Sequence, residues 1–195
     1  LSESDVAMQE SLADLLGQKA LVEFFYLDNI IRRIVATVDN LPREKVAQRL
    51  TPLKPVAGKF LVTGKEDNFV LNPGNYSRYA PYVRLAEAVN VKKLVAFYVH
   101  FYPLFQQAYK DLGYPSGYFN DRLVQVIDHL LAAPDVQGPV KLVQPSVMYQ
   151  FADHELEALS AGQKIMVRIG AKNAARIKAK LKEYRSELTS QEFKQ

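Results

Sequence analysis

Apolar residues recur at helical spacing along most of the chain, and this pattern predicts a mainly α-helical protein. The first predicted helices cover residues 2–16, a second run that ends near Tyr26, and residues 29–41. The third has the most regular apolar face, which consists of Ile30, Ile31, Ile34, Val35 and Val38. Pro42 is expected to open a fourth, short helix that ends near Leu50, because proline suits the first turn of a helix.

The periodicity changes after residue 50. Pro52 and Pro55 are incompatible with the interior of a helix. Short apolar runs at 60–62 and 69–71 predict the two strands of a hairpin, joined across residues 64–67. We therefore expect a small β element within a helical protein.

A helical pattern returns at residues 75–89 and continues in a longer helix over residues 91–112, which Asn90 can cap. Between residues 94 and 105 this helix is apolar nearly all round, which predicts that it is central and buried. Pro103 lies inside the helix, so we expect either a kink or a break there.

The next helix is expected to start at Ser116 or Asn120 and to end near residue 133. A short strand is possible at residues 140–143, and a last helix covers residues 171–188. Ser160 and Gln163 have the spacing of a reciprocal helix cap, which predicts a mainly structural role for Gln163.

These elements predict a mainly α fold: a single-domain, multi-helix bundle around a central kinked helix, with one or two short β-hairpins. The domain is expected to cover residues 1–195, with a possible peripheral hairpin at 58–72. A chain of 195 residues can bury a sizeable core without disulfides or a structural metal.

Composition excludes several classes of site. The chain has no cysteine, which rules out disulfides, thiolate nucleophiles and cysteine-ligated metal centres. Its longest apolar stretch, residues 94–105, is shorter than the roughly 20 residues that a membrane span needs. The chain begins at Leu1 and not at Met, so we expect that an upstream targeting segment has been removed.

The net charge of +4 is unevenly distributed. Residues 1–31 are acidic, whereas residues 164–187 hold eight bases against two glutamates. The last helix is therefore amphipathic, and its expected inward stripe consists of Ala174, Ile177, Leu181, Tyr184 and Leu188. Its bases could be solvated, pair with the acidic N-terminal helix, or contact anionic lipid. No sequence-reading motif is present, so no nucleic-acid partner is expected.

Eight of the eleven tyrosines lie between residues 76 and 118, and the last two of them are on a stiff turn at residues 113–122. Tyrosines commonly bury their rings while the hydroxyl finds a polar partner, so this region could simply be core. Together with the helix that follows, it is also the candidate functional surface, where a peptide, glycan or protein could bind. The candidate residues are Tyr114, Tyr118, Asn120, Asp121, Arg122, Asp128 and His129.

Part of this set offers acid–base chemistry. Asp121, Asp128 and His129 lie near Arg122 on one predicted helix, which is the composition of a hydrolase or transferase site. The alternative is that these side chains are solvated or paired with neighbours, since Asp121 suits a helix N-terminus. No nucleophile elbow and no phosphate-binding glycine loop accompany them.

Metal and cofactor sites are not expected. Asp128 and His129 could join Asp153 and His154, but the two pairs are distant in sequence and lack a local ligand spacing. We therefore expect no metal and no cofactor. The third histidine, His100, lies in the apolar run and is expected to be a core residue bonded to a backbone carbonyl.

Several segments also carry a family resemblance. They are residues 31–42, 101–109, 112–115, 118–124, 126–131 and 151–164. They resemble the proteobacterial domain-of-unknown-function family numbered three thousand and fourteen. Its members typically carry the domain behind an N-terminal transmembrane helix, so the resemblance implies a domain anchored at the inner membrane and facing the periplasm. It brings no assigned activity and no site residues.

The sequence therefore favours a non-enzymatic envelope domain that binds a protein or cell-wall partner. A hydrolase or transferase that uses Asp121, Asp128 and His129 near Arg122 is the second hypothesis. A cytosolic scaffold is the third. A concave site containing the carboxylates would favour the enzyme, whereas an exposed apolar patch would favour a binding partner.

Overall fold

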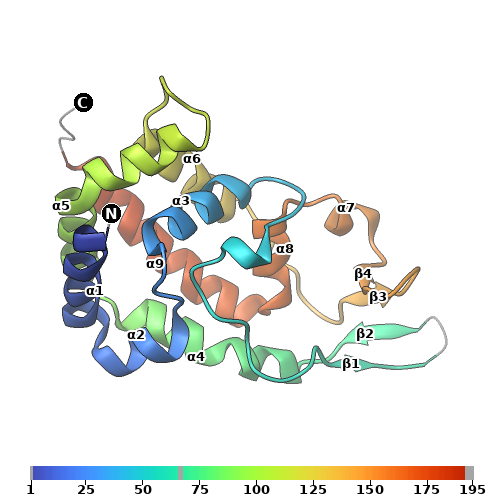
Figure 1. Cartoon of the computed structure of the whole chain (residues 1–195). Helices are drawn as coiled ribbons and strands as arrows, with labels where there is room; N and C mark the ends of the chain where they lie inside the picture. Colours follow the sequence, from blue (N-terminus) through green and yellow to red (C-terminus); the bar gives the residue numbers. More distant parts are fainter. Residues whose placement is uncertain (1, 66–67, 192–195) are drawn as a thin grey trace.

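A computed structural model describes residues 2–65 and 68–191, and side chains from Val6 onward in the first helix. This part of the chain contains nine α-helices, one 3-10 turn and four short strands (Figure 1). The helices are α1 (Ser2–Leu16), α2 (Gln18–Phe24), α3 (Ile30–Asn40), α4 (Gly74–Ala88), α5 (Val91–Asp111), α6 (Phe119–Leu131), α7 (His154–Glu157), α8 (Ala161–Arg168) and α9 (Ala171–Thr189). The 3-10 turn is η1 (Gln48–Leu50), and the strands are β1 (Val62–Thr63), β2 (Phe69–Leu71), β3 (Lys141–Val143) and β4 (Gln150–Phe151). The predicted mainly helical class is confirmed.

The helices form a bundle at one end of the molecule, and the sheet lies at the other end (Figure 1). Helix α5 contacts α1, α3, α6 and α9, as expected of a central helix. It runs unbroken past Pro103, so the predicted break is wrong. Asn90 caps α5 as predicted, since its side chain accepts a hydrogen bond from the Lys93 amide.

The four strands form one antiparallel sheet in the order β1-β2-β3-β4. The predicted hairpin is confirmed in β1 and β2, although Glu66 and Asp67 of its turn lie outside the described residues. The predicted strand at 140–143 becomes β3, which pairs with β2 and β4. Leu71, Leu142 and Phe151 are buried in a separate apolar cluster that includes Val167 of α8.

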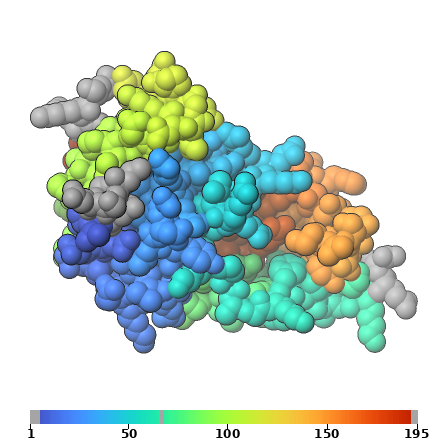
Figure 2. All heavy atoms as spheres, in the orientation of Figure 1, coloured from blue at the N-terminus to red at the C-terminus, as the bar shows by residue number. Residues whose placement is uncertain are grey.

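The predicted fourth helix is wrong. Residues 42–50 form only η1, because the Leu41 and Arg43 carbonyls accept hydrogen bonds from the first amides of α8, not from within a helix. Figure 2 shows this segment crossing the surface beside the bundle. The helix predicted to start at Ser116 or Asn120 begins at Phe119, one residue before the second of these positions, and it has no side-chain cap.

His100 is exposed, not buried as predicted, and its ring contacts the Phe101 ring edge-on. The cause is that α5 presents one side to solvent, where Ala96 and Val99 are also exposed. The nearly all-apolar segment 94–105 of this helix therefore has an outer face that the sequence pattern did not reveal.

The last helix packs as predicted, with Ala174 and Leu188 buried and the rest of its apolar stripe half-buried. Its bases, however, are largely engaged. Lys178 bonds to the Ala133 carbonyl and to Asp135 at 2.6 Å each, and its side chain is only 13% exposed. Arg176 pairs with Glu87, and Arg185 with Asp128. The predicted ring of solvated lysines is therefore wrong at Lys178, and the described partners of Arg176 and Arg185 lie on α4 and α6, not on α1.

Apolar side chains of the bundle line a partly open cavity of about 440 Å³, which we call the central chamber. Its lining includes Ile34, Val38, Leu85, Phe97, Leu123 and Leu181, which come from α3, α4, α5, α6 and α9. Protein interiors are normally close-packed. A cavity of this volume is many times larger than a water molecule, so the bundle departs from close packing here.

Candidate functional site

A buried carboxylate organises the turn that the sequence singled out. Asp39, in the last turn of α3, has a side chain only 4% exposed. Its Oδ2 accepts hydrogen bonds from Arg43 at 2.6 Å and from the Tyr114 hydroxyl at 3.2 Å. Its Oδ1 accepts from Arg122 Nε at 3.1 Å, and its backbone carbonyl accepts from Arg122 Nη2 at 2.9 Å. We call these four residues the Asp39 hub.

The hub carries a net positive charge, because it contains one carboxylate and two guanidinium groups. Burying a carboxylate costs several kcal/mol unless it is paired and hydrogen-bonded. Here Oδ2 has donors from Arg43 and Tyr114 and Oδ1 has one from Arg122, so the hub ties α3 to the turn and to α6. Arg43 also donates to the Tyr114 hydroxyl at 2.8 Å, which closes the network.

Gln106 of α5 also holds the turn, and we call its contacts the second clamp. The Gln106 side chain accepts from the Phe119 amide at 2.9 Å and donates to the Gly117 carbonyl at 2.7 Å. It also accepts from the Tyr102 hydroxyl at 3.1 Å. One side chain therefore satisfies the backbone groups of the turn on both sides of Tyr118, which fixes where α6 begins.

Aromatic packing completes the turn. The Tyr109 and Tyr114 rings stack with centroids 4.6 Å apart. A Cβ added at Gly117 would lie 3.1 Å from the Tyr109 ring, so the glycine allows this close approach. Burial and the nearby Asp39 carboxylate raise the pKa of Tyr109, so its hydroxyl stays protonated at neutral pH. The predicted partly buried turn is confirmed at Tyr114 and Phe119.

What this framework leaves exposed is a shallow depression of about 590 Å³. Its floor contains Asp39 and Tyr109, and its rim carries Ser116, Tyr118 and Asp121, all three of them exposed. Tyr118 is 44% exposed, so its ring is available to a partner at this rim. The depression can receive a partner side chain or sugar ring, with Tyr118 as a flat apolar contact and Asp121 as a hydrogen-bond acceptor.

The structure separates the remaining candidate residues. Asp128 pairs with Arg185 of α9, with one contact at 3.0 Å, and this partner lowers the pKa of Asp128. His129 lies 2.7 Å from the Ser160 hydroxyl through Nε2. Arg122 binds Asp39 and donates to Gln125. Three of the four residues of the enzyme hypothesis, Asp128, His129 and Arg122, therefore have different partners, and none of these contacts joins two of the four residues.

The His129 contact belongs to the start of α8. Ser160 caps α8 as predicted, because its hydroxyl accepts from the Gln163 amide at 3.2 Å. The Gln163 side chain does not return to Ser160, however, but donates to the His129 carbonyl at 3.1 Å. The reciprocal half of the predicted cap is thus wrong, although Gln163 does make a structural contact, which links α8 to α6.

Asn120 sits between the depression and α9. Its Oδ1 is buried without a hydrogen-bond partner among the described residues. Among those same residues, no group of three or more His, Asp or Glu side chains is placed to hold a metal ion. Asp153 instead caps α7 by accepting from the Glu155 and Leu156 amides.

Sequence reasoning missed Asp39, Arg43 and Gln106. Asp39 did leave a signal, because it follows Ile31 and Val35 at intervals of four on the buried face of α3. A charged residue on an apolar face needs a buried partner. Gln106 left no such signal, since a glutamine in a helix is ordinary and its contacts lie 11 and 13 residues away.

Comparison with known proteins gives one match. The model of a family described as "Protein of unknown function (DUF3014)" matches residues 30–185, which include the Asp39 hub and the whole turn. No curated protein and no solved structure matches the chain.

Proposed function

We propose that this chain, which belongs to the DUF3014 family, is a non-enzymatic binding domain that uses the turn at residues 114–122 to contact a protein or cell-wall partner. The observation that carries the proposal is that the charged groups of the hub are satisfied internally while Tyr118 remains exposed on a fixed turn. Rigid exposed aromatics with polar neighbours are typical anchors of binding surfaces.

The charge pairing supports binding over catalysis. A general acid or base must be free to exchange a proton with a substrate. Asp128 and Arg122 are instead held by Arg185 and Asp39, and burial keeps the Tyr109 hydroxyl protonated. Asp121 is exposed at the rim, where it suits a hydrogen bond to a partner.

We further propose that the domain works in the bacterial envelope, tethered to the inner membrane and facing the periplasm. The support is the family resemblance, whose members typically carry a membrane helix ahead of the domain. In the described residues, no helix is long and apolar enough to span a membrane. Protease treatment of spheroplasts that produce the full-length natural protein tests this location, and protection of the domain from external protease would contradict it.

Photo-crosslinking in living cells tests the binding surface. p-Benzoylphenylalanine in place of Ser116, at the rim of the depression, should give a discrete adduct with one partner. The same group in place of Val147, which is 86% exposed in the loop between β3 and β4, is the matched control and should give none. Tyr118→Ala should remove the adduct formed at position 116.

Isolated peptidoglycan provides the second arm. Co-sedimentation of the purified domain with sacculi, reduced by Tyr118→Ala, would identify the cell wall as the partner. The proposed surface is refuted if neither arm depends on Tyr118, or if positions 116 and 147 give the same adducts.

A further inference from the structure

The central chamber lies apart from the turn surface and has a chemistry of its own. We propose that it binds the aliphatic acyl chain of a lipid. Every residue that lines it is aliphatic, aromatic or proline, and within the described chain the polar lining atoms are essentially limited to three tyrosine hydroxyls. An occupant must therefore be almost wholly apolar.

The lining excludes a peptide as the occupant. Each residue of a buried peptide brings an amide donor and a carbonyl acceptor, and both need partners once they leave water. One of the three hydroxyls is already committed, since Tyr82 donates to the Lys54 carbonyl at 2.9 Å. Burial raises the pKa of Tyr184 to about 12, so this side chain offers a neutral hydroxyl and no charge. A hydrocarbon chain makes no such demands.

The size and course of the chamber suit a flexible chain. Its volume of about 440 Å³ is roughly three times that of an engineered apolar cavity that holds benzene, and it falls within the roughly 300–1,000 Å³ of ligand pockets. The lining extends from Phe119 and Leu123 of α6 to Tyr82 and Leu85 of α4. These helices lie on different sides of α9, as Figure 1 shows, and both contact it.

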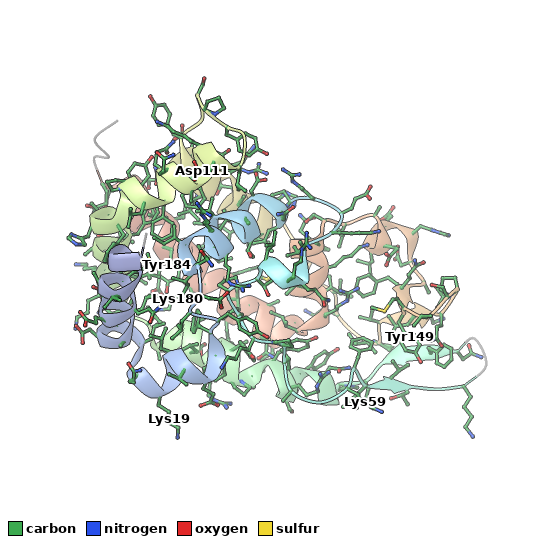
Figure 3. All side chains as sticks on the ribbon, viewed as in Figure 1. Lys19, Lys59, Asp111, Tyr149, Lys180 and Tyr184 are labelled. Carbon is green, nitrogen blue, oxygen red and sulfur yellow. The ribbon has the colours of Figure 1, made fainter. Side chains whose placement is uncertain are left out.

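A tyrosine and two lysines from different segments show how the chamber and the surface differ. Tyr184 lines the chamber, and Figure 3 shows it toward the middle of the bundle, whereas Lys19 and Lys59 point away from the molecule. A charged headgroup has no partner inside. It must stay at the edge of the chamber while the chain enters.

The segment around Pro52 and Leu53 marks that edge. Both residues line the chamber, and Leu53 is also 39% exposed. The segment is held to the end of α2 by two backbone hydrogen bonds of 2.8 Å, from Tyr26 to Pro52 and from Lys54 to Phe24, and the Lys54 ammonium also donates to the Val22 carbonyl at 2.6 Å. The entrance for an acyl chain therefore lies beside the exposed Leu53 side chain of a segment that stays in place.

Equilibrium binding of cis-parinaric acid, a fluorescent fatty acid, to delipidated protein tests the proposal. We expect saturable binding of one molecule per chain. Ala86→Phe fills the chamber from α4 and should weaken binding about tenfold or more, because an overpacked site excludes the ligand. Ala88→Phe, on the exposed side of the same helix, is the matched control and should leave binding unchanged.

A second filling variant helps to distinguish loss of binding from loss of the fold. Val38→Phe fills the chamber from α3, and circular dichroism with thermal unfolding shows which variants retain the fold. Loss of binding in a folded filling variant, with binding kept in Ala88→Phe, supports the proposal. Absence of saturable binding to the wild type, or full binding in both folded filling variants, overturns it.

Competition then identifies the source of the chain. Displacement by palmitate alone assigns a free fatty acid, and displacement also by short-chain phosphatidylglycerol assigns a phospholipid. Both results support an acyl chain. Displacement by an apolar peptide but by neither lipid contradicts the proposal.

Discussion

The Asp39 hub and the central chamber are two interiors of one bundle that are built on opposite principles. In the hub, both oxygens of a buried carboxylate have donors from different segments, and the turn is fixed by them. In the chamber, apolar side chains from five helices or more face a volume that they do not fill. The first interior specifies a single geometry at the surface above it. The second leaves room for a ligand. One bundle can therefore fix a surface site at one place and receive a ligand at another.

The largest expected effect comes from removing the charge of the hub. Asp39→Asn leaves Arg122, whose side chain is only 20% exposed, without its carboxylate. Breaking a buried pair in this way should lower the free energy of unfolding by about 3 kcal/mol. Urea unfolding measures the change. Asp111→Asn, which breaks an exposed contact of 3.6 Å to Arg32, is the control and should cost less than about 0.5 kcal/mol. Equal losses in the two variants would show that the hub is not a buried pair.

A smaller loss is expected at the second clamp. Gln106→Leu leaves the Phe119 amide and the Gly117 carbonyl without their partner, and two unsatisfied backbone groups should cost about 2 kcal/mol. Gln107→Leu is the matched control, because its side chain bonds only to the exposed Asp111. Faster amide exchange at Phe119 in the first variant, but not in the second, would locate the loss in the turn. Unchanged exchange would contradict the clamp.

Filling the chamber should raise the free energy of unfolding, whereas the two changes above lower it. In delipidated protein, Ala86→Phe should raise the free energy of unfolding by about 1 kcal/mol, because cavity filling adds contacts where none exist. Ala88→Phe should have almost no effect, since that position is exposed. Differential scanning calorimetry measures both. If the filling variant is the less stable of the two by a clear margin, the interior is closer packed than we describe.

The smallest effect concerns the sheet end of the molecule, outside both interiors. Burial alone would raise the pKa of Glu157, but hydrogen bonds from Lys164 and from the Phe151 amide outweigh it and hold the pKa below its usual 4.5. A lowered pKa stabilises the fold above about pH 4.5, and that contribution disappears as the pH falls through the folded-state value. The free energy of unfolding should therefore fall less on acidification below pH 4.5 in Glu157→Gln than in the wild type, by a difference of less than about 1 kcal/mol.

The control for that titration is Glu44→Gln, which alters an exposed residue after α3. It should leave the acid slope of the wild type unchanged. Acid denaturation curves that coincide for the wild type and Glu157→Gln would show that the Glu157 pairing is not formed in solution.

Sequence patterns predicted the elements better than their surroundings. Helix α3, the Asn90 cap and the first hairpin follow from local periodicity and capping, which depend on neighbours within a few residues. The prediction that His100 is buried was wrong, because apolar content does not reveal which side of a helix meets solvent. The prediction of a helix at residues 42–50 was wrong, because the first amides of α8, far along the chain, donate to the Leu41 and Arg43 carbonyls.

The candidate site was predictable in part for the same reason. The turn could be found from residue types alone, whereas the exposure of Tyr118 could not. The partners that fix it lie far away in sequence, since Asp39 is 83 residues from Arg122. The chamber was not predictable, because amphipathic stripes report that Leu123 and Leu181 point inward and not whether the space between them is filled.

Crystallography of the delipidated protein under xenon pressure tests the contrast between the two interiors most directly. Xenon enters dry apolar cavities and does not displace paired charges. We predict xenon density in the central chamber, between Val38 of α3 and Leu181 of α9, and none at the Asp39 hub. A chamber closed by collapsed side chains, with no xenon bound, would contradict the described interior and the acyl-chain site that depends on it.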